Sequence, residues 1–209
     1  MDRATAPPVP RDIAPRPSAG GEPVTLDEFE PWPFYCEESI ARLSGCEELM
    51  GLTAEVWTLC HGSGGFVMAR QQKGEGELGL ISWDYHVVLL VSDGSEHRIY
   101  DPDSQLGCPV PARRWLRESF PTLLGLFAAP RPLVRVLEAG RYREILRSDR
   151  SHMMDDEGRW IAPPPPWPAP GSGSAGEASN VLALADPNST QPGALIKLDE
   201  LKERFEKVG

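Results

Sequence analysis

Three residues that could form a nucleophilic site occur along the chain in the order Cys36, His86 and Asp101. Cys36 lies in the segment Pro-Phe-Tyr-Cys-Glu-Glu, where a loop is expected to enter a helix. At the N-terminus of a helix, the dipole and the free N–H groups favour the thiolate and can also bind an oxyanion. The position of Cys36 therefore predicts a nucleophile with a lowered pKa.

The base and its orienting carboxylate come from a predicted hairpin. Asp93-Gly94 is a strong signal for a two-residue turn between strands over residues 83–91 and 96–101. That turn would place His86 directly opposite Asp101, where a carboxylate can fix the imidazole tautomer. A purely structural His–Asp pair has the same geometry, and a slip of one residue would separate the two. The register alone leaves both interpretations open.

The other cysteines do not suggest a metal site. Cys46 lies within a predicted helix, Cys60 ends an apolar strand, and Cys108 lies in a Gly-Cys-Pro loop. None of the four cysteines forms a Cys-x-x-Cys pair, so a zinc ribbon is not indicated. Without a recognisable secretory signal we expect a reducing compartment and free thiols.

A mixed arrangement of elements surrounds these residues. Strands are expected in the middle of the chain, with helices toward both ends, which predicts an α+β fold with an antiparallel sheet packed against helices. We expect a hairpin formed by the strands 55–60 and 66–70, and a further strand at 133–137. The remaining expected elements are helices at 37–49, 111–120, 142–146 and 198–208, and a strand at 181–184.

Composition limits the partners. The 209 residues include 21 basic and 31 acidic side chains, a net charge of −10. This charge argues against nucleic acid and against an anionic membrane surface as partners. No apolar run approaches the ~20 residues of a membrane-spanning helix. A hydrophobic fraction of 40% is enough for a folded core.

Proline marks the predicted boundaries. The chain has 22 prolines, concentrated before residue 34 and in 163–170. We expect a disordered leader at 1–28 and a single catalytic domain at 29–209. Within that domain we expect a proline-rich strap at 161–170 and a flexible insertion at 171–177. The Pro-Pro-Pro-Pro-Trp-Pro run is interpreted as packed against the surface, with a docking site for a partner as the alternative.

At several motifs the chain resembles the protein N-terminal glutamine amidohydrolase family. The matching segments are Tyr-Cys-Glu-Glu at 35–38, Trp-Asp-Tyr-His-Val-Val-Leu-Leu at 83–90, Tyr-Asp-Pro-Asp at 100–103, Ser-Asp-Arg-Ser-His-Met at 148–153 and the proline run. The resemblance covers about residues 34–206 and implies a papain- or transglutaminase-like fold. It also implies a catalytic triad of Cys36, His86 and Asp101. The longer leader, the 171–177 insertion and the loop around 69–72 depart from the family pattern.

The resemblance implies deamidation of N-terminal glutamine in proteins or peptides, through a thioester and without a metal or organic cofactor. It also implies a place in the N-degron pathway, a cytoplasmic and possibly nuclear location, and a monomer. A papain-like peptidase or a transglutaminase-like acyl transferase is the alternative enzyme. An adaptor that docks through the proline run is the alternative without catalysis.

An enzyme that requires a free N-terminus needs a carboxylate for the substrate's α-ammonium group. Extending the predicted register places Asp84 opposite Asp103, where two like charges would need a cation between them. Two solvated aspartates are the alternative. Further candidates for substrate binding are Trp83, whose indole N–H could bind the oxyanion, and Glu37, Glu38, Asp149 and Ser151.

Overall fold

The computed structural model describes residues 29–62, 64–126, 130–171 and 178–206. The predicted leader at 1–28 and residues 172–177 of the predicted insertion lie outside these ranges. No helix within the described ranges is both long and apolar enough to cross a membrane.

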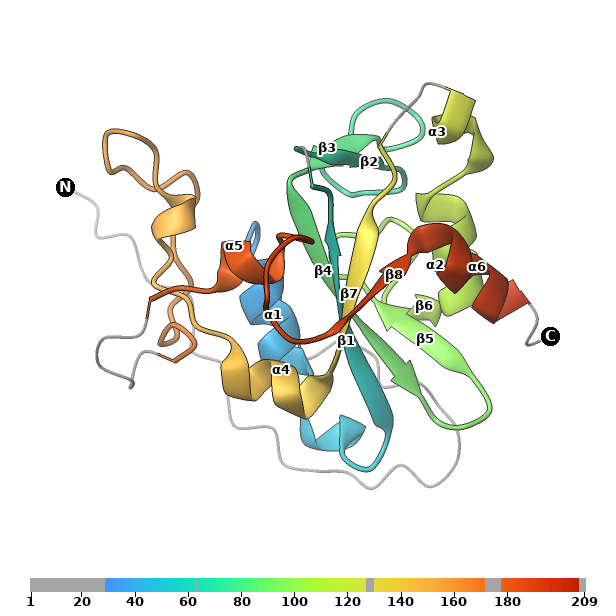
Figure 1. The fold of residues 1–209 in the computed structure, drawn as a ribbon, viewed down its shortest axis with the longest axis horizontal. Helices are drawn as coiled ribbons and strands as arrows, with labels where there is room; N and C mark the ends of the chain where they lie inside the picture. Colours follow the sequence, from blue (N-terminus) through green and yellow to red (C-terminus); the bar gives the residue numbers. More distant parts are fainter. Residues whose placement is uncertain (1–28, 63, 127–129, 172–177, 207–209) are drawn as a thin grey trace.

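A six-stranded sheet forms the centre of the molecule, in the order β6-β5-β4-β1-β7-β8 (Figure 1). Every neighbouring pair of strands in it is antiparallel. The strands are β1 (Thr53–Cys60), β4 (Tyr85–Ser92), β5 (His97–Tyr100), β6 (Val110–Pro111), β7 (Leu133–Glu138) and β8 (Ala194–Lys197). Two further strands, β2 (Phe66–Met68) and β3 (Ile81–Trp83), pair in a separate small sheet. The antiparallel sheet and its helices confirm the mixed class expected from the sequence.

Helices cover both faces of the central sheet. The helices α1 (Cys36–Leu43), α4 (Ala139–Ile145) and α5 (Val181–Leu184) pack on one face, and α2 (Ala112–Ser119) and α6 (Leu198–Glu206) pack on the other (Figure 1). Successive side chains of β4 pack alternately into the two layers. Val87, Leu89 and Val91 face the α1 side, whereas Val88 and Leu90 face the α2 side. This explains why β4 reads as a continuous apolar run.

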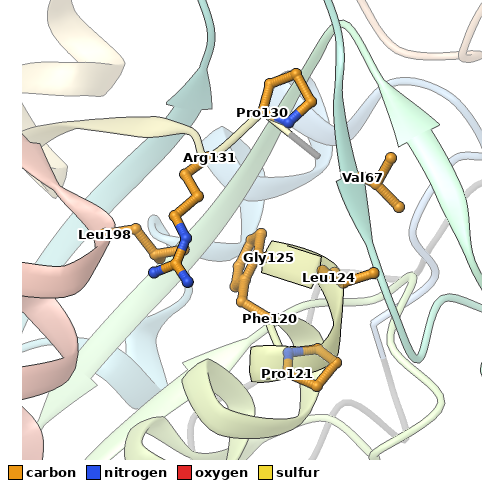
Figure 2. A pocket seen from close by; sticks show the side chains of 8 residues that line it. All are labelled: Val67, Phe120, Pro121, Leu124, Gly125, Pro130, Arg131 and Leu198. Carbon is orange, nitrogen blue, oxygen red and sulfur yellow. The ribbon is translucent and has the colours of Figure 1, made fainter. Parts of the chain in front are cut away.

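Three short elements complete the described chain: the 3₁₀ turns η2 (Glu47–Leu49) and η3 (Ser151–Met153), and the helix α3 (Thr122–Leu126). Beside α3 lies a small pocket with an apolar lining that includes Val67, Phe120 and Leu124 (Figure 2). Its volume is about 10 Å³, enough for about one water molecule. This pocket is too small for an organic ligand.

Several expected elements are wrong. Residues 55–60 and 66–68 do not form a hairpin, because β1 pairs with β4 and β7 while β2 pairs with β3. Residues 181–184 form the short helix α5, because Val181 and Leu184 lie one turn apart and both enter the core. The helix expected over 37–49 ends at Leu43 and is followed by η2. The edge strand β8 has only four residues, and the sequence pattern does not predict it.

The register of the β4–β5 hairpin also differs from the prediction. Ser92 pairs with His97, so the loop has the four residues 93–96 and the register is shifted by two. The Asp93 side chain closes this loop by accepting hydrogen bonds from the backbone N–H groups of Ser95 and Glu96, each at 2.8 Å. A shift of two residues preserves the face on which each side chain lies. His86 and Asp101 therefore remain on one side of the sheet despite the wrong register.

Candidate active site

Cys36 is the first residue of α1. The preceding residue, Tyr35, makes no side-chain cap, so the first N–H groups of the helix have no capping oxygen from it. Phe34 has a positive φ of 67°, which turns the chain sharply into the helix. The Cys36 side chain is 9% exposed, in an apolar layer with Ile40 and Val87. This is the helix-start position that the sequence predicted.

The expected low pKa of this thiol is wrong. Burial raises the pKa of Cys36 well above its ordinary value, and the nearby carboxylates of Glu37 and Asp103 raise it further. The backbone N–H of Val87 acts in the opposite direction but is outweighed. Loss of solvent and the two acidic neighbours outweigh whatever the helix N-terminus contributes to the thiolate. A thiol in this state needs a base to remove its proton.

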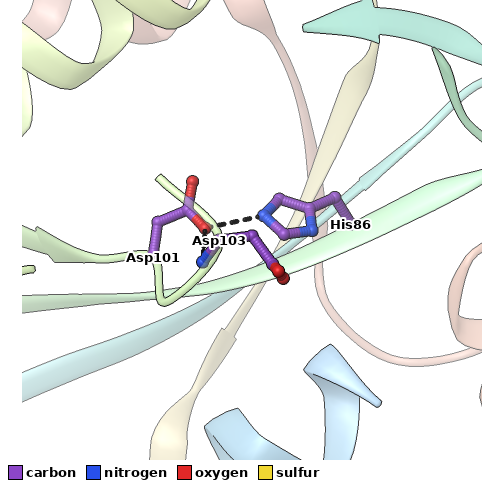
Figure 3. A group of neighbouring side chains, drawn as sticks. All are labelled: His86, Asp101 and Asp103. Atoms are coloured by element: carbon purple, nitrogen blue, oxygen red, sulfur yellow. Dashed lines mark hydrogen bonds and ion pairs between the residues drawn. The ribbon is translucent and has the colours of Figure 1, made fainter. Parts of the chain in front are cut away.

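His86 and Asp101 form a completely buried pair. The distance between His86 Nε2 and Asp101 Oδ1 is 2.9 Å, and neither side chain is exposed (Figure 3). Asp101 follows the last residue of β5, and its carboxylate also accepts hydrogen bonds from Trp115 Nε1 at 2.9 Å and Gln71 Nε2 at 3.2 Å. The backbone N–H of Asp103 donates to Oδ1. Asp101 is thus fixed from four directions.

These contacts set the charges of the pair. Burial lowers the pKa of His86, but the charge of Asp101 and its hydrogen bond outweigh that effect, so the pKa is raised. Burial also raises the pKa of Asp101, and here His86, Trp115 and Gln71 lower it on balance. Both shifts stabilise the imidazolium that His86 becomes once it has accepted a proton, beside a charged carboxylate.

The second ring nitrogen of His86 is unoccupied. Nδ1 is buried and has no hydrogen-bond partner among the described residues. One face of the imidazole ring is stacked on Trp83, with 5.0 Å between the ring centroids and 14° between the planes. The Trp83 indole Nε1 is likewise buried without a partner in the described chain. The ring is therefore held at Nε2 and on one face, while Nδ1 remains free to exchange a proton.

A pocket of about 110 Å³ lies at the nucleophile and reaches Asp103, which is close to this pair. Cys36, Asp103, Gln72 and Lys73 line it, together with Trp32 and its flanking prolines, Ser39 and Pro102. One potential ligand atom each of Asp103, His86 and Asp101, a carboxylate oxygen or a ring nitrogen, lies within 4.8 Å of the other two (Figure 3). Burial raises the pKa of Asp103, although His86 and Lys73 lower it in part. Asp103 thus links the pocket at Cys36 to the His–Asp pair.

The same three donors are a possible ligand set for a metal ion. The hydrogen bonds that His86 and Asp101 already make are more typical of a pair that transfers protons than of a metal site. Asp101 already receives side-chain N–H donors on both carboxylate oxygens, and His86 Nε2 is committed to Asp101. A cation at this point would have to displace those hydrogen bonds.

Glu37 is buried, does not line the pocket, and belongs to a second cluster of polar and aromatic side chains. Its Oε2 accepts hydrogen bonds from Tyr85 Oη at 3.2 Å and from Cys36 Sγ at 3.7 Å. Its Oε1 lies 3.3 Å from His152 Nε2, although the geometry is not that of a hydrogen bond. Tyr35 and Tyr85 both contact the His152 ring. Glu37 acts on the Cys36 thiol through its charge.

Glu38, in contrast, anchors the proline-rich segment. Arg150 Nε and Nη2 each donate to its carboxylate at 2.8 Å, and Trp167 Nε1 donates at 2.9 Å. Arg150 also donates to the carbonyl groups of Pro165 and Trp167. We call the contacts among Glu38, Arg150 and Trp167 the latch, because they tie the first turn of α1 to the proline run.

The remaining candidates lie at the surface. Asp84 is exposed between β3 and β4, and the actual register does not place it opposite Asp103. Asp149 and Ser151 are also exposed and hydrogen-bond to each other, with the hydroxyl and N–H of Ser151 lowering the pKa of Asp149. The structure brings neither of them into the pocket lining. Sequence reasoning missed Gln71, Trp115 and Lys73, because no local pattern marks a residue that acts only through a distant neighbour.

Comparison with known proteins supports the family suggested by the motifs. The family model described as N-terminal glutamine amidase matches residues 32–205. The human protein N-terminal glutamine amidohydrolase is 35% identical over 180 residues, which cover 82% of this chain and 85% of the human protein. The cattle protein of the same name is 35% identical, with 82% and 84% covered. The relative from Drosophila mojavensis is 30% identical over 184 residues, with 83% and 86% covered. The chain belongs to the N-terminal glutamine amidase family.

Proposed function

We propose that this protein deamidates the N-terminal glutamine of proteins or peptides, and that Cys36, His86 and Asp101 carry out the reaction. The observation that carries this proposal is the state of His86. Asp101 occupies Nε2, and Nδ1 is free, in a cluster that reaches the pocket of Cys36 through Asp103. A base oriented in this way beside a protonated thiol is suited to nucleophilic catalysis.

In the first half-reaction, His86 Nδ1 accepts the Cys36 proton as sulfur attacks the side-chain carbonyl carbon of glutamine. The tetrahedral intermediate collapses when the C–N bond breaks. The departing nitrogen takes the proton from His86 and leaves as ammonia, and a γ-glutamyl thioester remains. The raised pKa of His86 favours the protonated form that this donation requires.

In the second half-reaction, His86 removes a proton from water as the water oxygen attacks the thioester carbon. The C–S bond then breaks, the sulfur regains a proton, and an N-terminal glutamate is released. Asp101 remains charged throughout and holds the imidazole in its orientation. The unpartnered Trp83 indole N–H and the first N–H groups of α1 are the donors that we assign to the oxyanion.

Asp103 is the group that we assign to the substrate's α-ammonium. It is half-buried in the same pocket as Cys36 and lies beside His86. A carboxylate there would distinguish a free N-terminus from an internal glutamine, whose backbone N–H carries no charge. Of the carboxylates considered from the sequence, Asp103 alone lines this pocket.

We also assign the fold to the papain- and transglutaminase-like class. The grounds are a cysteine at a helix start, a histidine on β4, and an aspartate directly after the neighbouring strand β5.

The test compares three peptides that begin with glutamine, begin with asparagine, or carry glutamine internally. Only the first should yield ammonia together with N-terminal glutamate, identified by mass spectrometry so that spontaneous cyclisation is excluded. Acetylation of the first peptide should reduce kcat/KM by about 10²-fold or more, because Asp103 is left without its cation.

Two variants complete the experiment. Cys36→Ala should abolish turnover and keep the fold, whereas Cys46→Ala should retain activity, because Cys46 lies beyond the C-terminal end of α1 and does not line the pocket. Full activity of Cys36→Ala would refute the mechanism. Equal turnover of internal glutamine would favour a transglutaminase-like acyl transferase instead, and backbone cleavage would favour a peptidase.

A further inference from the structure

Phe34 lies next to the nucleophile in an unusual state. It is 43% exposed and has a φ of 67°, in the left-handed region that bulky residues rarely adopt. Strain of this kind persists only where the surrounding contacts impose it, and it occurs often at ligand sites. The strained turn presents the ring at the surface, two residues before Cys36. The exposed ring is therefore a candidate for contact with a ligand.

Lys73 lies directly over that ring. Its Nζ is 3.5 Å from the ring centroid, which is the geometry of a cation–π contact. Lys73 also lines the pocket that contains Cys36 and Asp103. Among the described residues, no carboxylate lies within ion-pair distance of its ammonium group. The ring thus fixes the position of a cation whose charge is not neutralised by a direct partner.

Exposure differs along the pocket lining. Cys36 is buried, Asp103 is half-buried and Lys73 is exposed, and Phe34, which does not line the pocket, lies exposed beside Lys73. On the function proposed above, the first substrate residue has its side-chain carbon at Cys36 and its ammonium at Asp103. The peptide must then leave through the exposed end, past Phe34 and Lys73. The second residue of the substrate is the first one to reach that end.

We propose that Phe34 and Lys73 form a subsite for the second residue of the substrate, which favours an acidic side chain over a basic one. The ammonium of Lys73 pairs with a carboxylate there and repels a lysine or arginine. The methylene groups of the substrate's second side chain pack on the Phe34 ring. Because Lys73 is exposed, the preference is moderate and decreases with salt.

The experiment uses three peptides that begin Gln-Glu, Gln-Ala and Gln-Lys and are otherwise identical. N-terminal glutamate formation is followed by mass spectrometry, with the Cys36→Ala protein as the blank. We expect kcat/KM for Gln-Glu to exceed that for Gln-Lys by about tenfold at low salt. At 1 M salt, where the Debye length is about 3 Å, the ratio should approach one.

Two variants identify the residues. The ratio of the two kcat/KM values is the readout, because it does not depend on a change in overall rate. Lys73→Met keeps most of the stem and removes the charge, so the ratio should fall to about one. Phe34→Leu keeps an apolar side chain but removes the ring that holds the ammonium, so the ratio should fall to about half. Lys197→Met on the distant strand β8 changes the net charge equally and should leave the ratio unchanged.

The outcomes separate the two proposals. A wild-type ratio near one, or an unchanged ratio in either the Lys73 or the Phe34 variant, would overturn the subsite while glutamine turnover persisted. A loss of preference in the Lys197 variant would show that only net charge matters and would also overturn it. A wild-type protein that forms N-terminal glutamate from none of the three peptides would overturn the proposed function itself.

Discussion

Two histidines with buried side chains, His86 and His152, each face a carboxylate, but their surroundings differ. His86 and Asp101 are joined by a 2.9 Å hydrogen bond, and Asp101 receives further donors from Gln71 and Trp115. His152 and Glu37 lie 3.3 Å apart without hydrogen-bond geometry. The first carboxylate is saturated with partners, which is what the orientation of a base requires. The second is surrounded by aromatic rings and affects the site mainly through its charge.

The largest expected effect separates the two histidines directly. His86→Ala should reduce kcat by 10³-fold or more, because it removes the base for both half-reactions. His152→Ala should reduce kcat by less than tenfold, because its nitrogens make no hydrogen bond in the described chain. Steady-state turnover of a peptide that begins with glutamine measures both, with circular dichroism to show that the variants fold. An equal loss in the two variants would contradict the distinction.

The carboxylates give the next largest effect. Asp101→Asn should lower kcat by 10²- to 10⁴-fold, since an amide can support the wrong imidazole tautomer. Glu37→Gln should preserve most of kcat, because Glu37 does not contact His86. If Glu37→Gln proved the more damaging change, Glu37 and His152 would have to be regarded as the catalytic pair.

A smaller effect tests how Asp101 is held. Trp115→Phe removes one donor to Asp101 while keeping an aromatic side chain, so kcat should fall by about tenfold with little change in KM. Tyr85→Phe removes the comparable donor to Glu37 and should change kcat by no more than about twofold. The two variants lose one hydrogen bond each, so the ratio of their kcat values reports which carboxylate depends on exact orientation.

The smallest effect is a shift along the pH axis. Glu37 raises the pKa of the Cys36 thiol, so Glu37→Gln should lower that pKa and move the onset of iodoacetamide alkylation to lower pH, by about one unit or less. In the unmodified protein, alkylation of Cys36 should be slow at mildly acidic pH and accelerate as the pH rises. Mass spectrometry of the labelled peptide follows both. Fast labelling of Cys36 at mildly acidic pH would show that the carboxylates do not control this thiol.

The sequence predicted the parts of the site that depend on local patterns. Cys36 at a helix start and the His86–Asp101 hydrogen bond both follow from short motifs. The hydrogen bond is predicted correctly although the predicted turn is wrong, because a two-residue shift in register leaves both side chains on the same face of the sheet. The pKa of Cys36 did not follow, because it depends on burial and on Asp103, 67 positions later in the chain. The pairing of β1 with β4 and β7 is also non-local, and the local pattern predicts a different partner for β1. The pKa of Cys36 and the pairing of β1 both depend on which distant segments of the chain meet, and short motifs do not carry that information.

The latch has a consequence for the order in which the protein becomes active during synthesis. Glu38, two residues after the nucleophile, depends on Arg150 and Trp167, which follow it in the chain by 112 and 129 positions. A ribosome must therefore complete about four-fifths of the polypeptide before the first turn of α1 can reach its native contacts. Until then Glu38 remains a solvated carboxylate, and the helix that carries the thiol lacks its support. Assembly of the thiol site is thereby delayed until most of the chain has left the ribosome.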